Sequence, residues 1–196
     1  MNEENDSYVI YKPYGVLSQF TPEGNRPALG SLFRFPKDCY PVGRLDAESE
    51  GLLIISNDAS LNRKLLDPVN EHARTYFVQV DGEISEEAVA QLRSGVEIKV
   101  EGKSYRTKKS VAEKIAEPFL PASVPPVRFR KSIPTSWISL TLAEGKNRQV
   151  RHMTAAVGFP TLRLVRVKIE NLELGNMQPG EVRKIKGSEL KRLLKL

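Results

Sequence analysis

The sequence contains little cysteine, little histidine and no long apolar run, and each shortage excludes a class of protein. The single cysteine, Cys39, rules out an internal disulfide and is typical of a reducing compartment. Two histidines and one cysteine do not supply the ligand spacing of a zinc site, so we expect no metal. No apolar run approaches the ~20 residues that span a bilayer, and the polar start of the chain does not resemble a signal peptide. We therefore expect a cytoplasmic protein.

Several catalytic motifs are also missing. The sequence has no phosphate-binding loop of the Walker type, no Gly-x-Gly-x-x-Gly fingerprint and no Gly-x-Ser-x-Gly nucleophile elbow. Composition alone does not exclude a Ser-His-Asp triad, but no local pattern supports one. Carboxylate chemistry and simple RNA binding remain as the function classes to distinguish.

The net charge of +6 is distributed unevenly along the 196 residues. Residues 1–100 contain 10 Lys/Arg and 16 Asp/Glu, whereas residues 101–196 contain 20 and 8. The second half therefore has a balance of +12, against −6 for the first half. This asymmetry favours a polyanionic partner that binds mainly to the second half, although basic surfaces also serve solubility.

Strand patterns outnumber helix patterns in this sequence. The strands do not alternate regularly with long helices, which argues against a doubly wound fold. We predict an α+β fold with a mixed or antiparallel sheet, and the segment 52–55 is apolar throughout, as in a strand buried on both faces. The expected strands are 8–11, 52–55, 75–80, 137–142 and 162–169.

Short helices and one long loop complete the pattern. Residues 117–136 are rich in proline, which cannot donate to a strand ladder, and they also contain several cations, so we expect a Pro-rich basic loop there. Three helices are expected after a capping residue and one is expected from its amphipathic pattern. These are the segment capped by Asp58 with Leu61, Leu65 and Leu66, the segment from Ser85 to Gly95, the segment capped by Asn147 and closed by Gly158, and 188–196.

Two segments concentrate charged residues beside turn glycines. In the first segment, 43–53, Asp46 stands in a loop directly before the buried strand, where a catalytic carboxylate would be held in one place. A turn or capping aspartate is the alternative interpretation. In the second segment, 144–153, Arg148, Arg151 and His152 fall at i, i+3 and i+4 on one face of the expected helix. A solvated helix face is the alternative there, and the spacing alone does not decide.

These two segments and three others, all in the same order, resemble the pseudouridine synthases of the RsuA-type branch, which is typified by an enzyme of small-subunit rRNA. The resemblance covers residues 7–186. The matching motifs are Lys12-Pro13-Tyr14-Gly15, Gly43-Arg44-Leu45-Asp46, Arg74-Thr75-Tyr76, Glu144-Gly145-Lys146-Asn147-Arg148-Gln149-Val150-Arg151 and Gly158-Phe159-Pro160-Thr161-Leu162-Arg163-Leu164-Val165-Arg166.

Residues 130–137 are similar to the subgroup that acts on large-subunit (23S) rRNA and lacks the N-terminal S4 RNA-binding domain. The first expected strand begins near Tyr8, which leaves no room for an S4 module. The resemblance therefore implies that residues 1–196 form a single catalytic domain of two lobes, with the sheet across both lobes and a central active-site cleft. Two departures from the pattern, Ser49 and His152, lie outside the residues that carry the chemistry.

The resemblance also implies a reaction: isomerisation of a specific uridine of 23S rRNA to pseudouridine, after the nucleotide is flipped out of its stack. The residue that matches the family's essential carboxylate is Asp46, and Arg151 matches the basic residue that pairs with it and favours its ionised form. Tyr76 matches the tyrosine that packs against the extruded base. No redox change occurs, so we expect no cofactor.

RNA contacts are expected from cations and one aromatic residue. Arg44 matches the motif arginine that fills the space left by the flipped base and holds phosphate, and Leu164 is expected in the apolar wall of the pocket. The remaining candidates are Arg128, Phe129, Arg130, Lys131, Arg148, Arg163 and Arg166.

The expected partner is 23S rRNA, with no membrane, and the expected state is a monomer. Two alternatives remain at this point. One is a non-catalytic rRNA-binding or ribosome-assembly protein that kept the fold, which an intact set of Asp46, Tyr76 and Arg151 argues against. The other is a pseudouridine synthase specific for tRNA.

Overall fold

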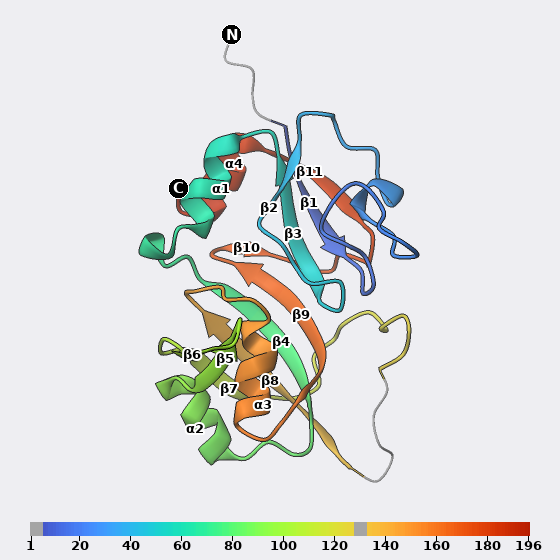
Figure 1. Cartoon of the computed structure of the whole chain (residues 1–196). Helices are drawn as coiled ribbons and strands as arrows, with labels where there is room; N and C mark the ends of the chain where they lie inside the picture. Colours follow the sequence, from blue (N-terminus) through green and yellow to red (C-terminus); the bar gives the residue numbers. More distant parts are fainter. Residues whose placement is uncertain (1–5, 128–132) are drawn as a thin grey trace. The chain divides into compact units, whose positions relative to one another are not determined.

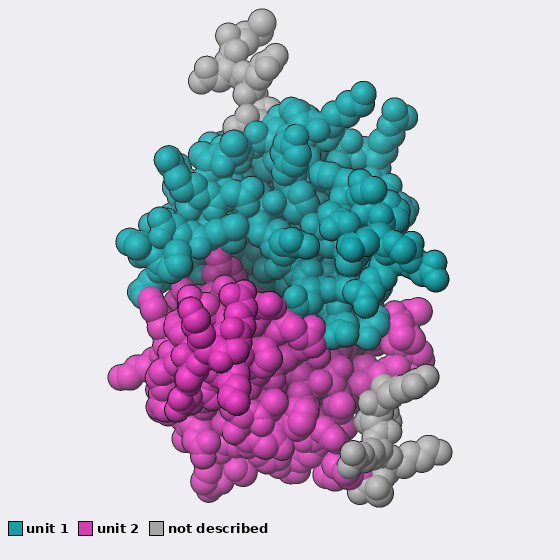
Figure 2. Space-filling view, in the orientation of Figure 1, with its two compact units in different colours: residues 1–72, 166–196 teal, residues 73–165 magenta. Residues whose placement is uncertain are grey.

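The computed structural model describes residues 6–127 and 133–196, and the chain divides into two compact units (Figure 2). Unit 1 consists of residues 1–72 and 166–196, and unit 2 consists of residues 73–165. The chain leaves unit 1 once and returns to it within strand β9 (Thr161–Ile169). Among the described residues, no helix is both long enough and apolar enough to cross a membrane.

The strands of unit 1 pair in the order β11-β1-β3, and β2 pairs with β3 (Figure 1). Each of these pairs is antiparallel, as is the pair formed by β10 and the end of β9. All seven residues of β3 are buried, which confirms the prediction of a strand covered on both faces. The bounds are Asp6–Lys12 for β1, Tyr40–Val42 for β2, Glu50–Ser56 for β3, Leu172–Glu173 for β10 and Val182–Lys186 for β11.

One face of β1 and β3 packs on the segment that joins β1 to β2. This segment contains the short 3-10 helix η1 (Leu29–Ser31) and a group of aromatic rings at contact distance. Because it is packed on the sheet, the segment holds the chain in place just before the loop that contains Asp46. The buried members of this cluster are Tyr8, Ile10, Val16, Leu29, Cys39, Leu53 and Ile55, with Phe20 and Phe35 partly buried against them.

The helices of unit 1 are α1 (Ala59–Leu66), α4 (Gly187–Leu193) and the 3-10 turn η2 (Pro68–Asn70). Asp58 is the N-cap of α1 and accepts a hydrogen bond from the Ser60 backbone N–H at 3.0 Å, as predicted. Its other oxygen forms an ion pair at 2.8 Å with Lys191 of α4. The helix contains Leu61, Leu65 and Leu66, as predicted; Leu61 and Leu65 are buried, and Leu66 is 47% exposed.

Unit 2 contains strands in the order β4-β8-β7, all antiparallel, and a separate hairpin of β5 and β6. Alternate residues of β4 and β8 point into a core that α2 and α3 complete, so the fold is α+β as predicted. The Pro-rich loop follows β7. The bounds are Arg74–Asp81 for β4, Glu86–Ser94 for α2, Glu97–Val100 for β5, Lys103–Arg106 for β6, Val111–Ile115 for β7, Thr135–Leu142 for β8 and Gln149–Ala156 for α3.

The two helices of unit 2 differ in how well their caps follow from sequence. Ser85 caps α2, and Gly95 ends it at a φ of +88°, where an added Cβ would lie 2.3 Å from a backbone oxygen of Thr107. The prediction that Asn147 caps the next helix is wrong by one residue. Arg148 is the N-cap of α3, in the left-handed conformation and without a side-chain capping bond. Side-chain contacts of Gln149, described below, hold this start.

The charge of the folded protein is divided differently from the charge of the sequence. Counted by unit, unit 1 contains 15 Lys/Arg and 15 Asp/Glu, and unit 2 contains 15 and 9, so the net +6 belongs entirely to unit 2. The C-terminal cations pair with acids of unit 1: Lys184 pairs with Asp6 at 2.5 Å and Lys195 with Glu170 at 2.7 Å. The net positive charge of the protein therefore belongs to unit 2, although the sequence places most cations in residues 101–196.

We expect Asp58→Ala to lower the free energy of unfolding by about 1–2 kcal/mol, because it removes both the cap of α1 and the ion pair to α4. Burial raises the pKa of the Asp58 carboxyl, but the bonds to Lys191 and Ser60 outweigh it and lower the pKa to about 2. A carboxyl with a lowered pKa stabilises the fold above its ordinary pKa and loses this effect as the pH falls. The difference from wild type in urea unfolding should therefore shrink between pH 4 and pH 2.

Lys191→Ala is the comparison, since it removes the ion pair and keeps the cap. Its side chain is 38% exposed, so we expect the free energy of unfolding to fall by less than about 1 kcal/mol. An equal effect in both variants would contradict the capping role.

Candidate active site

The loop between β2 and β3 contains Asp46, and hydrogen bonds fix its backbone on both sides of this residue. The Ser18 hydroxyl donates to the carbonyl of Leu45 at 2.7 Å and accepts from the Leu45 N–H at 3.0 Å. The carbonyl of Ala47 accepts from the Gly15 N–H at 2.7 Å. The half-buried carboxylate therefore extends from a backbone whose neighbours on either side are anchored to the segment after β1.

The start of the loop has its own requirement. Gly43 has a φ of +72°, in the left-handed region that favours glycine, and its N–H donates to the Asn62 side chain of α1 at 3.1 Å. A Cβ at this position would lie 3.0 Å from a methyl group of Leu66. The glycine of the Gly43–Asp46 motif is thus explained by local geometry. Arg44, the next residue, is exposed, as a phosphate-binding role needs.

Lys12 is the buried cation of this loop. Its side chain is 0% exposed, and its ammonium donates to the carbonyls of Val16 at 2.7 Å, Pro13 at 2.8 Å and Ala47 at 3.3 Å. One ammonium therefore ties the end of β1 to the residue that follows Asp46.

Electrostatic effects on Lys12 oppose one another. Burial lowers the pKa of its ammonium to about 7, the carboxylates of Glu50 and Asp46 act to raise it, and Arg166 acts to lower it. Three carbonyl acceptors can be satisfied together only by the protonated form, which has three N–H donors. Lys12 is the first residue of the Lys12-Pro13-Tyr14-Gly15 motif, for which a supporting role is the sequence-based interpretation. A lysine at the end of an otherwise apolar, buried strand is the signal that indicates a structural cation.

In unit 2, Tyr76, Leu164 and helix α3 belong to one core. Tyr76 lies on β4 opposite Leu140 and packs, partly buried, on a cluster that includes Leu164 and, from α3, Val150 and Met153. Leu164 is 5% exposed, which suits a wall residue. Arg151 lies between the two α3 core residues in sequence and is half-buried. Tyr76 and Leu164 therefore belong to the core to which α3 contributes Val150 and Met153.

The predicted RNA contacts have different environments. Arg148 is exposed at the start of α3. Arg163 is 8% exposed and donates to the carbonyl of Pro121 at 2.8 Å, and Arg166 is 5% exposed and donates to the carbonyl of Leu52 at 2.8 Å. Their burial and these bonds favour roles in holding the loop at Pro121 and strand β3. The candidates Arg128, Phe129, Arg130 and Lys131 lie outside the described residues.

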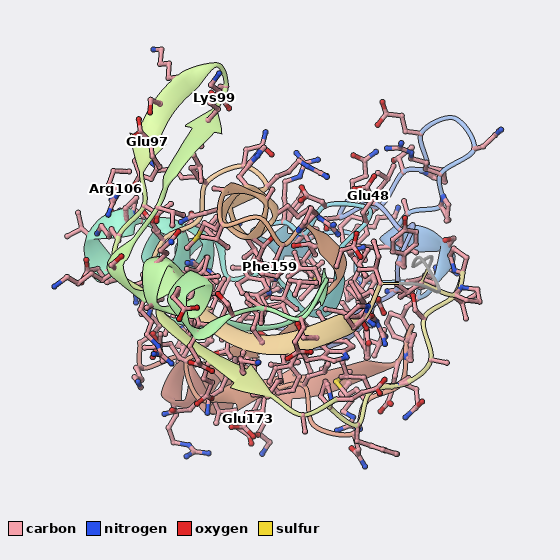
Figure 3. All side chains as sticks on the ribbon, turned by 90° about the horizontal axis from the view of Figure 1, so that it is seen from below. Glu48, Glu97, Lys99, Arg106, Phe159 and Glu173 are labelled. Carbon is pink, nitrogen blue, oxygen red and sulfur yellow. The ribbon has the colours of Figure 1, made fainter. Side chains whose placement is uncertain are left out.

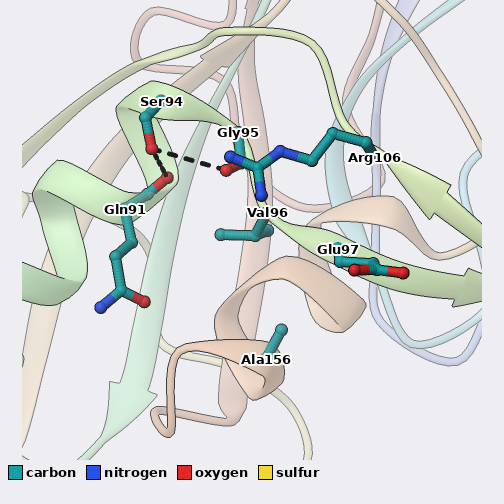
Figure 4. A pocket seen from close by; sticks show the side chains of 7 residues that line it. All are labelled: Gln91, Ser94, Gly95, Val96, Glu97, Arg106 and Ala156. Atoms are coloured by element: carbon teal, nitrogen blue, oxygen red, sulfur yellow. Dashed lines mark hydrogen bonds between the residues drawn. The ribbon is translucent and has the colours of Figure 1, made fainter.

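A hollow of about 370 Å³ lies in unit 2 at the end of α2 (Figure 4). Two of its residues, Glu97 and Arg106, are exposed and face each other across the β5–β6 hairpin. None of the predicted catalytic residues lines it. The hollow therefore follows from the junction of helix and hairpin and carries no catalytic assignment. Its lining residues are Gln91, Ser94, Gly95, Val96, Glu97, Arg106 and Ala156.

Comparison with known proteins identifies the family of the chain. The chain belongs to the RNA pseudouridylate synthase family, whose model matches residues 6–156. This range contains Asp46, Tyr76 and Arg151. The predicted family is confirmed.

Two curated relatives and one solved structure are similar to the chain over most of its length. The ribosomal large subunit pseudouridine synthase E of Vibrio parahaemolyticus is 46% identical, over 93% of this chain and 75% of its own length. The protein of the same name from Xanthomonas axonopodis pv. citri is 44% identical, over 87% of this chain and 89% of its own. A crystal structure of a pseudouridylate synthase, 25% identical, matches with a TM-score of 0.78 over 97% of this chain and 74% of that one.

We expect Lys12→Met to destabilise the protein by about 1–3 kcal/mol at pH 7, because the carbonyls bound by the ammonium lose a donor inside the fold. The methionine keeps the length of the side chain. Lys37→Met, at an exposed position of the same unit, should change the free energy of unfolding by less than about 0.5 kcal/mol. Urea unfolding of the three proteins measures both effects.

The effect of Lys12→Met should also depend on pH. The folded pKa of Lys12, about 7, lies below its ordinary value of 10.5, so between these values the unfolded chain binds more protons. Raising the pH then stabilises wild type relative to Lys12→Met, by up to about 1.4 kcal/mol per pH unit. A difference that stays flat from pH 7 to pH 10 would mean that the three carbonyls keep the ammonium charged.

Proposed function

We propose that this protein is an RNA pseudouridine synthase that isomerises a specific uridine of large-subunit (23S) rRNA, with Asp46 as the catalytic carboxylate. The observation that carries the proposal is the anchored Gly43–Asp46 loop within the matched family region. The relatives named for the large ribosomal subunit support the choice of substrate. We further propose that residues 1–196 act as one catalytic domain of two lobes, a monomer in the cytoplasm, with the Pro-rich basic loop at 117–136.

The reaction exchanges one glycosidic bond for another. The bond between ribose C1′ and uracil N1 breaks, the base turns, and a bond between C1′ and C5 forms. C5 loses its proton and N1 gains one, so atoms and electrons balance without a cofactor. A stacked base cannot turn, so the nucleotide must first leave the helix, at a cost of a few kcal/mol.

Asp46 must act as a carboxylate, either by attack on the sugar or by removal of a ribose proton. Both roles need a defined position for the carboxylate, which the bonds to Leu45 and Ala47 supply. We propose that Arg151 is the cationic partner that favours the ionised form. Tyr76 would pack against the extruded base, with Leu164 in the wall behind it, and Arg44 would take the vacated space.

RNA binding would rest on unit 2, which carries the whole net charge of +6. Phosphate contacts supply most of the affinity of basic proteins for nucleic acid, and they position the substrate without reading its sequence. In this proposal Arg148, the cations of the Pro-rich loop and, from unit 1, Arg44 hold the RNA. The other cations of unit 1 add little, because Lys/Arg and Asp/Glu are equal in number in that unit.

We expect Asp46→Asn to abolish pseudouridine formation while changing RNA affinity by less than about twofold, because affinity depends on phosphate contacts elsewhere. The substitution keeps the size of the side chain and removes its charge. Release of the C5 hydrogen from labelled rRNA transcript measures turnover, and filter binding measures affinity.

Asp38→Asn, at an exposed aspartate of the same unit, is the control and should keep the wild-type rate. Turnover in Asp46→Asn would move the carboxylate role to another residue. RNA binding by a wild-type protein that shows no turnover would favour a non-catalytic binding protein.

A charge comparison between the units tests where RNA binds. We expect the triple change of Arg128, Arg130 and Lys131 to Gln to make the plot of log affinity against log salt shallower, by roughly 0.7–0.9 for each phosphate that the protein no longer neutralises. The matched triple change of Lys168, Arg183 and Lys184 to Gln removes three solvent-accessible cations that pair with acids of unit 1. Its slope should equal that of wild type. The reverse result would assign the RNA surface to unit 1.

A further inference from the structure

A buried carboxylate, Glu144, stands at the start of the segment that leads from β8 to α3. It is 6% exposed and, from residues 6–127 and 133–196, accepts three hydrogen bonds, all from neutral donors. The Tyr105 hydroxyl donates to one oxygen at 2.5 Å. The backbone N–H of Lys108 at 2.9 Å and the side-chain amide of Gln149 at 2.6 Å donate to the other. The carboxylate thus joins strand β6, the segment after it and the first residue of α3.

Gln149 extends this network into the helix. Its amide oxygen accepts from the Lys146 backbone N–H at 2.9 Å, and its amide nitrogen also contacts the Met153 sulfur at 3.7 Å. Lys146 in turn places its ammonium 4.9 Å from the centre of the Tyr105 ring. The Gln149 side chain, at the end of the loop 144–149, is therefore bonded to the carboxylate of Glu144 at its start and to the backbone of Lys146 within it.

The loop between these ends contains a strained residue. Arg148 has φ 51° and ψ 30°, a left-handed conformation that non-glycine residues rarely adopt. Strain of this kind persists only where the surroundings determine the conformation, and here the bonds of Gln149 and Glu144 do so. The conformation sets where α3 begins, and Arg151 is the third residue of that helix.

We propose that Glu144 is a positioning residue for Arg151: its carboxylate fixes the first turn of α3 through Gln149, and so fixes the cation that serves Asp46. The inference rests on the proposed function, since it assigns a support to a residue of that site. Glu144 is thus assigned a supporting role and not a catalytic one. It acts through Gln149 and the backbone of Arg148.

Tyr105 is the residue that joins the β5–β6 hairpin to Glu144. The hydrogen bond to Glu144, together with burial, raises the pKa of Tyr105 to about 12, so its hydroxyl remains a donor at neutral pH. Tyr105 belongs to the β5–β6 hairpin, which projects from unit 2 with Glu97, Lys99 and Arg106 on it (Figure 3). The hairpin is thereby connected to the start of α3 through one carboxylate.

The experiment compares four variants by single-turnover rate at saturating RNA, by RNA affinity and by thermal unfolding. Glu144→Ala should lower the rate by roughly tenfold to a hundredfold, since a small displacement of a catalytic group has effects of this size. Affinity should stay within twofold. Tyr105→Phe, which removes one of the three bonds, should lower the rate less.

Glu144→Gln should restore most of the rate. Its amide oxygen can accept from Lys108 and Gln149, and its amide nitrogen can donate to the oxygen of Tyr105, so the geometry is kept without the charge. Glu97→Ala is the matched control, because this exposed glutamate accepts its hydrogen bond from Ser104 within the same hairpin and lies outside the Glu144 network. It should keep the wild-type rate.

A double-mutant cycle with Arg151→Met separates positioning from general support of the fold. If Glu144 acts through Arg151, Glu144→Ala should have little further effect on the rate once Arg151 is replaced. Independent multiplication of the two effects, or a rate of Glu144→Ala within twofold of wild type, overturns the inference. If Glu144→Ala does not fold, the same cycle with Tyr105→Phe decides.

The outcome is distinguishable from failure of the proposed function. If the proposed function fails, wild type itself forms no pseudouridine. If the proposed function holds, wild type is active, Asp46→Asn is not, and only the dependence on Glu144 is at issue.

Discussion

The carbonyl of Ala47 is bound by both the Gly15 N–H and the ammonium of Lys12, and the catalytic proposal depends on this junction. A carboxylate on a free loop would sample many positions, and a displacement of about 1 Å can cost a hundredfold in rate. Here the backbone after Asp46 is held by the end of β1 and the residues that follow it, and the backbone before it is held by Ser18. The loop is short and polar, yet it has the fixed position of a sheet residue.

Burial of Lys12 is unfavourable for stability, since an ammonium that leaves water loses its hydration. The three carbonyls at 2.7–3.3 Å replace that hydration in part, and the burial still lowers the pKa of the ammonium to about 7. A methionine of the same length would avoid the desolvation but would leave the carbonyls without a donor. The presence of a cation at this buried position is therefore explained by the three carbonyls that it binds, one of which belongs to the residue after Asp46.

Local patterns in the sequence predicted what local chemistry determines. Asp58 and Ser85 have the cap geometry that their side chains favour, and the apolar run of β3 is buried throughout, because these features depend on few residues. The start of α3 could not be predicted in this way. Asn147 is the better capping residue by type, but Glu144 and Gln149 make the helix begin one residue later. The distribution of charge over the two units could not be predicted either. The chain returns to unit 1 after residue 165, and cations near its end form ion pairs with acids of that unit.

Each of the two candidate catalytic segments is held by one buried charged residue, and the two charges have opposite signs. Lys12 is a buried ammonium whose three bonds end on carbonyls, and Glu144 is a buried carboxylate whose three bonds come from neutral donors. A buried charge in either setting keeps its bonds only in one arrangement of the surrounding backbone, because each donor or acceptor has a fixed direction. Neighbouring functional residues, Asp46 in one case and Arg151 in the other, are then placed by the backbone, so their own side chains are not required to hold the loops. This division assigns the support of each segment to one charged residue and the proposed chemistry to another. It also explains why the supporting charges are the more deeply buried ones.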